Sequence, residues 1–461
     1  MNSILHEIPN MNNLLEHQLF SGIERGRVKR AAQSFLDELR GGVLSGDVRD
    51  MPAIDECARR VLSIIDDEKQ TNLRGLINAT GVVLHTNLGR APLGVELCAG
   101  IAEICSGYCN LEYNLETGSR GSRYAHVEEL ICELSGAQAA LVVNNNAAAT
   151  YLMLAALLSG KRVAVSRGEL VEIGGSMRVP EIMEQSGAEL VEVGTTNKTR
   201  LSDYVNAVEK KGVKGLLKVH TSNYEIVGFT ESVTVSELAA YGKENGLPVL
   251  YDMGSCFLVE PELLGLRVGE TAPSGIKAGA DIICFSGDKL LGSTQAGVLA
   301  GRADYISAMK SHPITRMVRP DKFTLAALEA SLQLYRYPGE AIKRIPVLAM
   351  LSAKPEELRR RAADLAQRFK ELFAGWEIEV RETEDETGGG SLPNVQLPGW
   401  AVALKPSGMS VAELERRLRL GRIPVIIRIQ DGMALVSLRT LTPAEEGVLL
   451  EAFRAIYTRD R

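Results

Sequence analysis

The sequence predicts an α/β fold whose central part is a mainly parallel sheet with helices on both faces. Two observations support this fold class. From about residue 75 to 320, short apolar runs alternate with stretches of helical periodicity, which is the rhythm of βαβ crossovers. In addition, Asp252 and Lys289 each follow closely after an apolar run. Ligands bind beyond the carboxyl ends of the strands in such sheets, so these two residues mark a candidate site.

The chain is 461 residues long, and we predict three domains. Residues 1–68 form a small N-terminal helical domain, because apolar side chains such as Leu14 and Phe35 recur there at helical spacing. A run of charged residues closes this segment. Residues 69–325 form the central domain, and residues 326–461 form a C-terminal α+β domain in which the regular alternation stops.

Apolar runs and helical periodicity locate the individual elements. In the central domain, helices are predicted between the strands, for example at 147–158 and 233–245. Seven apolar runs are predicted strands of this domain: 140–143, 162–166, 190–193, 215–219, 248–251, 281–285 and 296–300. The C-terminal domain is predicted to contain helices at 323–337, 355–373 and 443–457, a glycine-rich turn at 388–390, and strands at 425–429 and 433–437.

Composition excludes several classes of protein. The net charge of −6 argues against a protein coated in basic surface for nucleic acid, although a local basic patch stays open. No apolar run is long enough to cross a bilayer, and the N-terminus lacks a signal-peptide pattern. The seven cysteines form no CxxC pair, so we expect reduced thiols, no metal site and a cytoplasmic protein.

The stretch CFSGDKLLG, residues 284–292, carries Lys289 into a loop directly after a buried strand. Asp252 ends the strand before it. In this arrangement a lysine can hold pyridoxal phosphate (PLP) as a Schiff base, and an aspartate can keep the pyridine nitrogen protonated. Taken singly, such an aspartate is more often a helix cap and such a lysine more often solvated. The two together favour PLP as the cofactor.

Two further groups of polar residues fit such a cofactor. Asn144, Asn145 and Asn146 follow a strand and open a helix, whose N-terminal amides make a phosphate site. Ser286 stands three residues before Lys289 and can add a hydroxyl to the same phosphate. A plain helix cap is the alternative interpretation of the asparagines.

The strand at 215–219 ends in His220, followed closely by Asn223. The imidazole of His220 can stack on a flat cofactor ring, and Asn223 can reach the phenolic oxygen of that ring. A satisfied polar residue at a strand end is the alternative interpretation of His220.

Five arginines stand in short segments rich in glycine and proline. Arginine forks bind tetrahedral oxyanions bidentately, so these residues suggest a second anion site beyond the cofactor phosphate. An ordinary surface ion pair is the alternative for any one of them. The arginines are Arg90, Arg120, Arg123, Arg316 and Arg319.

Taken together, six motifs resemble those of the bacterial selenocysteine synthases, the L-seryl-tRNA(Sec) selenium transferases. The resemblance runs from about residue 75 to 340 with little interruption. Several long motifs in the right order are far more specific than a lysine and an aspartate. The motifs are INATGVVLHTNLGRAPL (77–93), VVNNNAAA (142–149), VSRGELVEIGG (165–175), EVGTTN (192–197), KVHTSNY (218–224) and FSGDKLLG (285–292).

The resemblance implies a PLP-dependent transferase of the aspartate-aminotransferase fold, fold type I, assembled as a ring of dimers that is a homodecamer in bacterial members. It implies conversion of seryl-tRNA(Sec) to selenocysteinyl-tRNA(Sec) with selenophosphate, through a PLP-bound aminoacrylyl-tRNA. Lys289 matches the Schiff-base lysine and Asp252 matches the pyridinium partner. Arg123 and Asp288 match residues near the reacting serine.

The family match also assigns partners to the remaining cations. Arg90, Arg316 and Arg319 match the positions that bind the phosphate of selenophosphate, in sites assembled across subunits. The N-terminal helical domain matches the part that binds tRNA(Sec), although a solvated helix face is the ordinary interpretation of its basic cluster. That cluster consists of Arg25, Arg27, Lys29 and Arg30.

The sequence departs from the family pattern at two places near the lysine. Cys256 stands where a glycine is expected, and Ser293-Thr294-Gln295 stands where Gly-Pro-Gln is expected. The main alternative function is a related PLP-dependent lyase acting on a small amino acid or amino-sugar acid, a class that generally lacks the N-terminal tRNA-binding segment. A catalytically inactive tRNA-binding scaffold is a third alternative, which the presence of both Asp252 and Lys289 disfavours.

Overall fold

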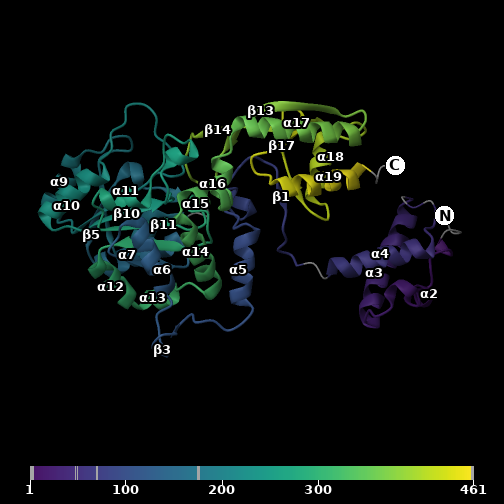
Figure 1. Cartoon of the computed structure of the whole chain (residues 1–461), viewed down its shortest axis with the longest axis horizontal. Coiled ribbons are helices and arrows are strands. Elements are labelled where there is room, and N and C mark those ends of the chain that lie inside the picture. The colour runs from purple at the N-terminus through teal and green to yellow at the C-terminus, as the bar shows by residue number, and fades with distance from the viewer. Residues whose placement is uncertain (1–4, 47, 49, 69–70, 174–176, 458–461) are drawn as a thin grey trace. The chain divides into compact units, whose positions relative to one another are not determined.

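The structure is a computed structural model of the whole chain (Figure 1). It describes residues 5–46, 48, 50–68, 71–173 and 177–457. The chain divides into two compact units, Met1–Leu76 and Ile77–Arg461. None of the helices in the described residues is both long enough and apolar enough to cross a membrane.

The first unit is helical and has a hydrophobic core of its own. Its longest helix, α3, turns a stripe of buried residues inward and ends at Gly46, whose φ of 85° is the left-handed conformation of a glycine cap. Val28 and Leu36 of α3 pack against Ala58 and Val61 of α4. The elements of this unit are α2 (Met11–Leu15), η1 (Gln18–Phe20), α3 (Arg25–Ser45) and α4 (Ile54–Glu68).

The second unit is built on a seven-stranded sheet in the order β4-β12-β11-β10-β9-β5-β8. All strand pairs from β11 to β8 are parallel, whereas β12 is antiparallel to both of its neighbours. The seven predicted strands and the mainly parallel sheet are therefore confirmed. The strands are β4 (Ala139–Val143), β5 (Arg162–Ser166), β8 (Glu189–Val193), β9 (Gly215–Val219), β10 (Val249–Gly254), β11 (Ile282–Ser286) and β12 (Gly297–Gly301).

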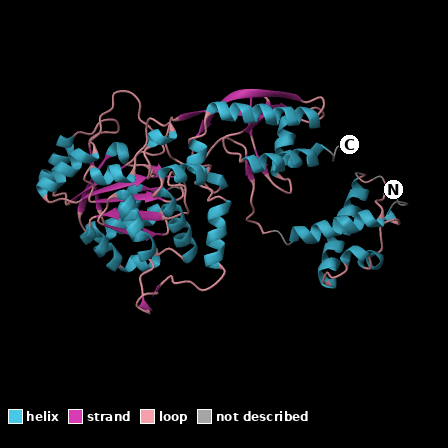
Figure 2. Ribbon diagram, viewed as in Figure 1, coloured by secondary structure: helices cyan, strands magenta, loops and turns pink. Residues whose placement is uncertain are grey.

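Helices cover both faces of this sheet (Figure 2). Along each strand the side chains alternate between the faces, so that Leu141 packs on one side and Val142 on the other. Burial on both faces explains why these strands are continuous apolar runs in the sequence. One face is covered by α7 (Asn146–Leu158), α8 (Val179–Gln185) and α12 (Ala303–Ser311). The other is covered by α6 (Ala125–Ser135), α9 (Leu201–Lys211), α10 (Val235–Asn245), α11 (Ala272–Lys277) and α14 (Lys322–Tyr335), with α5 (Val95–Cys105), α15 (Pro338–Arg344) and α16 (Pro346–Leu351) packed on them.

A second, antiparallel sheet in the order β13-β14-β17-β16 follows in the chain. Its hydrophobic core is separate from that of the central sheet and also contains Ile77 and Ala79, because β1 pairs with β15. The elements here are β1 (Ile77–Asn78), α17 (Pro355–Leu372), β13 (Glu377–Glu386), β14 (Gln396–Lys405), α18 (Val411–Arg419), β15 (Val425–Ile426), β16 (Arg428–Gln430), β17 (Met433–Ser437) and α19 (Pro443–Tyr457).

Two features of this part differ from the sequence prediction. The single strand predicted at 425–429 is two strands, β15 and β16, which belong to different sheets. The strands β13 and β14 were not predicted. In β13 the charged residues of EIEVRETEDE alternate with few apolar ones, and only three of its ten residues are buried, so the apolar signal of a strand is weak.

A buried ion pair connects the INATG motif to the second sheet. Asp385 is fully buried and accepts hydrogen bonds from Arg439 Nε at 3.0 Å and from Ser437 Oγ at 3.1 Å. Burial raises the pKa of Asp385, and the charge of Arg439 opposes that rise only in part. Gly81 lies so close that a side chain there would collide with the Asp385 carboxylate. The glycine of the INATG motif is therefore required by packing.

Removal of one partner of this pair is expected to be costly, because it leaves a buried charge without compensation. Asp385→Ala should lower the free energy of unfolding by on the order of 3–5 kcal/mol. Glu379→Ala is the matched control, because Glu379 pairs with Arg381 at the surface of the same strand, where exposed pairs contribute less than about 1 kcal/mol. Denaturant unfolding followed by tryptophan fluorescence measures both. Equal losses in the two variants would contradict this account.

Candidate active site

Asp252 lies at the carboxyl end of β10 and is only 1% exposed. Three donors hold its carboxylate. Asn146 Nδ2 donates to Oδ1 at 2.8 Å, Thr150 Oγ1 donates to Oδ2 at 2.7 Å, and the Gly254 amide donates to Oδ1 at 2.9 Å. Asn146 and Thr150 stand one turn apart on α7, so a single helix face presents both side chains. The carboxylate is thereby fixed in a solvent-free position.

Lys289 lies in the turn that follows β11 and is 6% exposed. No side chain in the described part of the chain forms an ion pair or hydrogen bond with its amine. Burial lowers the pKa of Lys289, and the charge of Arg90 lowers it further, whereas Asp252 and Asp288 oppose the shift. A buried amine without a hydrogen-bond partner, close to a fixed carboxylate, is well placed to react as a free base.

Arg90 and Asp288 form an ion pair beside this lysine, with 2.6 Å between Nη1 and Oδ2. Arg90 has a φ of 62°, which is a rare left-handed conformation for a residue with a side chain. Its amide donates to the His85 carbonyl at 3.2 Å, which closes the turn of the LHTNLGR motif. The turn therefore directs a cation toward the lysine.

Sheet register brings Ser286 close to the asparagine motif. Ser286 is paired with Gly297 across β11 and β12, and Gly297 is paired with Val143 across β12 and β4. A side chain at Gly297 would collide with the carbonyl oxygen of Asn145, so the glycine allows this close approach. Ser286 and the N-terminus of α7 consequently lie at the same edge of the sheet.

The three asparagines have different environments. Asn145 caps α7, because its Oδ1 accepts the Ala148 amide at 2.8 Å, so the helix-cap interpretation holds for this residue. Asn146 is the partner of Asp252, and its own Oδ1 is buried without a hydrogen-bond partner among the described residues. Asn144 is exposed, and its amide donates to the Val318 carbonyl at 2.8 Å.

His220 adjoins Asp252, because its amide donates to the Asp252 carbonyl at 2.8 Å. Its Nδ1 lies 3.7 Å from a carboxylate oxygen of Glu270. A cavity of about 380 Å³ opens beside it, and the ion pair of Lys218 and Glu169 forms part of its lining. Burial raises the pKa of Glu169, although Lys218 opposes the shift. Asn223 is exposed, and its side chain donates to the Glu172 carbonyl at 2.9 Å.

The predicted arginines fall into separate groups. Arg123 donates to Glu112 at 2.5 Å and to the Pro320 carbonyl at 2.7 Å, and Arg120 and Arg319 lie at 3.0 and 3.7 Å from the same glutamate. Arg316 lies on the short helix α13 (Pro313–Met317), is exposed and forms no ion pair with a described residue. Of these five predicted arginines, all of which lie in the described part of the chain, Arg90 alone carries a charge that shifts the pKa of Lys289.

Sequence reasoning missed Thr150 and Glu112. Thr150 is four residues after Asn146, so helical spacing could have placed both on one face. No local signal identifies Glu112 as the acid shared by three arginines. The two departures from the family pattern face the protein interior. Cys256 is fully buried within a hydrophobic cluster, and burial raises the pKa of its thiol. Ser293 is likewise fully buried.

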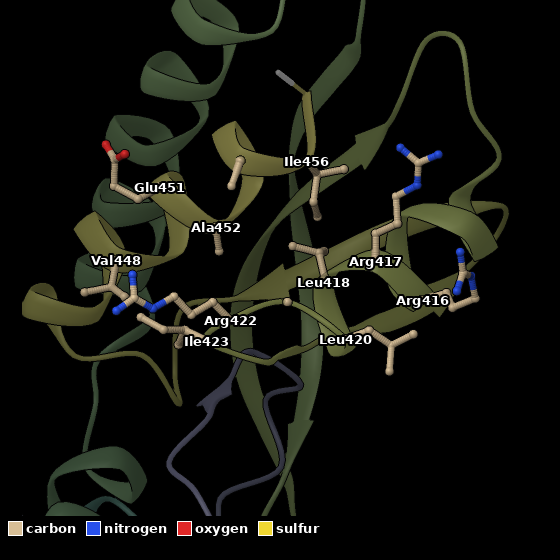
Figure 3. A pocket seen from close by; sticks show the side chains of 12 residues that line it. Arg416, Arg417, Leu418, Leu420, Arg422, Ile423, Val448, Glu451, Ala452 and Ile456 are labelled. Carbon is tan, nitrogen blue, oxygen red and sulfur yellow. The ribbon is translucent and has the colours of Figure 1, made fainter. Parts of the chain in front are cut away.

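A separate apolar groove lies in the C-terminal part of the chain, between α18 and α19 (Figure 3). Its floor includes Leu418, Ala452 and Ile456, and Arg416 and Arg422 stand among its lining residues. It has a volume of about 550 Å³. It contains none of the site residues predicted from the sequence.

Comparison with known proteins decides the family. The model of the L-seryl-tRNA selenium transferase family (SelA) matches residues 76–442. The chain belongs to the L-seryl-tRNA selenium transferase family. It is 45% identical over 454 residues to the L-seryl-tRNA(Sec) selenium transferase of Moorella thermoacetica, covering 98% of this chain and 96% of the relative. It is also 45% identical over 461 residues to that of Geobacter sulfurreducens, covering 98% and 99%.

The selenium transferase chain also resembles a solved structure. It superimposes on that of D-glucosaminate-6-phosphate ammonia-lyase with a TM-score of 0.56 and 19% identity, covering 84% of this chain and 96% of the other. This likeness concerns the fold alone. The predicted fold class is confirmed: it is the fold type I architecture of the PLP-dependent transferases, with N-terminal helices and a C-terminal antiparallel sheet.

The charges around Lys289 predict opposite effects of two substitutions on its titration. Arg90→Met should raise the pKa of Lys289, because a nearby positive charge is removed and Asp288 loses its partner. Asp288→Asn should lower the pKa of Lys289, because a nearby negative charge is removed. The pH dependence of modification of Lys289 by an amine-directed reagent, read by mass spectrometry on cofactor-free protein, measures both. Shifts in the same direction would contradict this picture of the site.

Proposed function

We propose that this protein converts seryl-tRNA(Sec) to selenocysteinyl-tRNA(Sec), with selenophosphate as the selenium donor and PLP as its cofactor. The observation that carries the proposal is the buried amine of Lys289, which has no hydrogen-bond partner among the described residues, beside the fixed carboxylate of Asp252. Membership of the selenium transferase family supports the choice of substrate.

The residues present fit PLP. Lys289 supplies a buried amine with no hydrogen-bond partner in the described chain, and Asp252 supplies a fixed carboxylate for the pyridine nitrogen. Backbone amides at the start of α7 and the hydroxyl of Ser286 would bind the cofactor phosphate. His220 and Asn223 would contact the cofactor ring. When bound, PLP supplies an electron sink for negative charge at the α-carbon of the substrate.

The reaction would then depend on which side chains of this protein transfer protons and which stabilise charge. The Lys289 amine would take the α-proton of the serine, because burial favours its neutral form. Asp252 would keep the ring nitrogen protonated. Asp288 and Arg123 would lie near the serine hydroxyl that leaves. The resemblance to the family at these two positions supports this part of the proposal.

Arg90, Arg316 and Arg319 would bind the phosphate of selenophosphate and stabilise it as it leaves. The exposed position of Arg316, and its lack of an ion pair with any described residue, support a site completed by another subunit. Exposed apolar residues around α5, among them Val95, Ile104 and Tyr108, support a homo-oligomer. We propose the decamer of five dimers implied by the family.

The N-terminal helical domain would bind tRNA(Sec). Arg25, Lys29 and Arg30 are exposed on α3 and form no ion pair with a described residue, whereas Arg27 donates to the Ile65 carbonyl. Three exposed cations on one helix support contact with phosphates. We also propose a cytoplasmic location, which agrees with the seven free thiols.

Lys289→Ala should abolish both the yellow colour of the cofactor-loaded protein and the transfer of selenium, because no other amine is expected to replace it. The assay combines PLP, seryl-tRNA(Sec) and labelled selenophosphate, and identifies the aminoacyl group formed. Lys243→Ala, a change of an exposed lysine on α10, is the control and should retain both. Transfer of selenium by the Lys289→Ala variant would contradict the assignment of Lys289 as the cofactor lysine.

Replacing Arg25, Lys29 and Arg30 together by glutamine should weaken binding of seryl-tRNA(Sec). The slope of log K for binding against log salt concentration should also become shallower, by about one for each phosphate that the variant no longer neutralises. Arg40→Gln is the matched control, because Arg40 lies on the same helix but pairs with Asp37. Binding is measured by filter retention over a range of salt concentrations. An unchanged slope would favour a PLP-dependent lyase that does not use this segment.

A further inference from the structure

The turn between β13 and β14 reaches the loops of the candidate active site. We name residues 388–394 the C-terminal turn. A side-chain carbon added at Gly389 would lie 2.9 Å from the Leu84 carbonyl oxygen, and one at Gly390 would lie 3.2 Å from Asn223. Asn394 Nδ2 donates to a carboxylate oxygen of Glu225 at 2.7 Å. The turn thus packs on two of the family motifs.

The backbone of the C-terminal turn is unusual. Its three glycines have positive φ values. Leu392 and Asn394 also have positive φ, at 51° and 63°, although each carries a side chain. Such conformations are costly and persist only where the surroundings hold them. The shape of this turn is therefore imposed by what it contacts.

Two buried hydroxyl groups connect the turn to the lysine loop. Ser391, 4% exposed, donates from Oγ to Ser255 Oγ at 2.8 Å. Ser255, 3% exposed, accepts the amide of Leu290 at 3.4 Å. Leu290 immediately follows Lys289, and Ser255 follows Asp252 by three residues. The hydrogen bonds therefore link the second sheet to both loops that carry the central residues of the site.

This link matters because the Lys289 amine has no side-chain partner of its own in the described chain. Its position depends on the backbone at Lys289 and directly after it. The Gly292 amide donates to the Lys289 carbonyl at 2.8 Å. The Leu290 amide donates to Ser255 Oγ, and the Ser255 hydroxyl in turn accepts a hydrogen bond from Ser391.

We propose that Ser391 is a positioning residue for the reaction: acting through Ser255, it fixes the backbone next to Lys289 and hence the place of the reactive amine. This inference rests on the proposed function, in which Lys289 holds the cofactor and moves the proton. Loss of the Ser391 hydroxyl leaves Ser255 free to rotate away from Leu290, and an amide so buried is costly to leave unpaired.

The experiment compares Ser391→Ala, Ser255→Ala and the double variant in the full chain loaded with PLP. Ser391→Ala should lower kcat by about ten-fold, because a small displacement of a reacting group is enough for such a loss. The KM for seryl-tRNA(Sec) should stay unchanged. The pH midpoint of the visible absorbance of the bound cofactor should also shift. Ser391→Thr, which keeps the hydroxyl, should restore both properties.

The double variant separates positioning from a general structural role. If Ser391 acts through Ser255, the double variant should behave like Ser255→Ala alone, because the second change removes nothing more. Multiplication of the two effects, or an unchanged kcat and absorbance midpoint in Ser391→Ala, would overturn the proposal. Ser407→Ala, an exposed change in the same part of the chain, is the control for folding, which thermal unfolding monitors.

Failure of this inference is distinguishable from failure of the proposed function. If the unmodified protein binds no PLP, or if Lys289→Ala still transfers selenium, the proposed function fails. If the unmodified protein is active and Ser391→Ala matches it in kcat and in absorbance midpoint, only the positioning role fails.

Discussion

A carboxylate buried away from water must receive hydrogen bonds from nearby donors. The site is built around the donors that surround the Asp252 carboxylate. The donors come from the side chains of Asn146 and Thr150 and from the backbone of Gly254. Because two of them belong to α7, the carboxylate fixes the start of that helix against the sheet. The same helix start carries the Asn145 cap and the amides proposed to bind phosphate. The buried carboxylate of Asp252 thus fixes both the group proposed to bind the ring nitrogen and the helix start proposed to bind the phosphate.

The environment of Lys289 differs from that of Asp252. Lys289 is buried but has no partner in the described chain, so burial and the neighbouring Arg90 lower its pKa. Arg90 is itself held by Asp288 and by the left-handed turn of its motif. Backbone hydrogen bonds around Lys289 then determine where the amine lies. Arg319 lies instead 3.7 Å from Glu112, and Arg316 stands on the short helix α13.

Much of the central domain could be predicted from the sequence because its strands are buried on both faces and are therefore continuous apolar runs. The lysine and the aspartate could be found because each follows such a run. The local sequence pattern did not predict β13, because its many charged residues weaken the apolar signal of a strand. It predicted a single strand at 425–429, where one apolar run forms β15 and β16 in two different sheets. It also failed for partners far apart in the chain. Thr150 meets Asp252, and Ser391 meets Ser255, only because the fold brings them together.

The most direct test of the central role of Asp252 is the protonation state of the ring nitrogen in protein loaded with PLP labelled with ¹⁵N at that position. The chemical shift of this nitrogen distinguishes the protonated ring from the neutral one. We expect a protonated nitrogen at neutral pH in the unmodified protein and a neutral nitrogen in Asp252→Asn. A neutral nitrogen in the unmodified protein, or a protonated one in both proteins, would contradict the central role of Asp252.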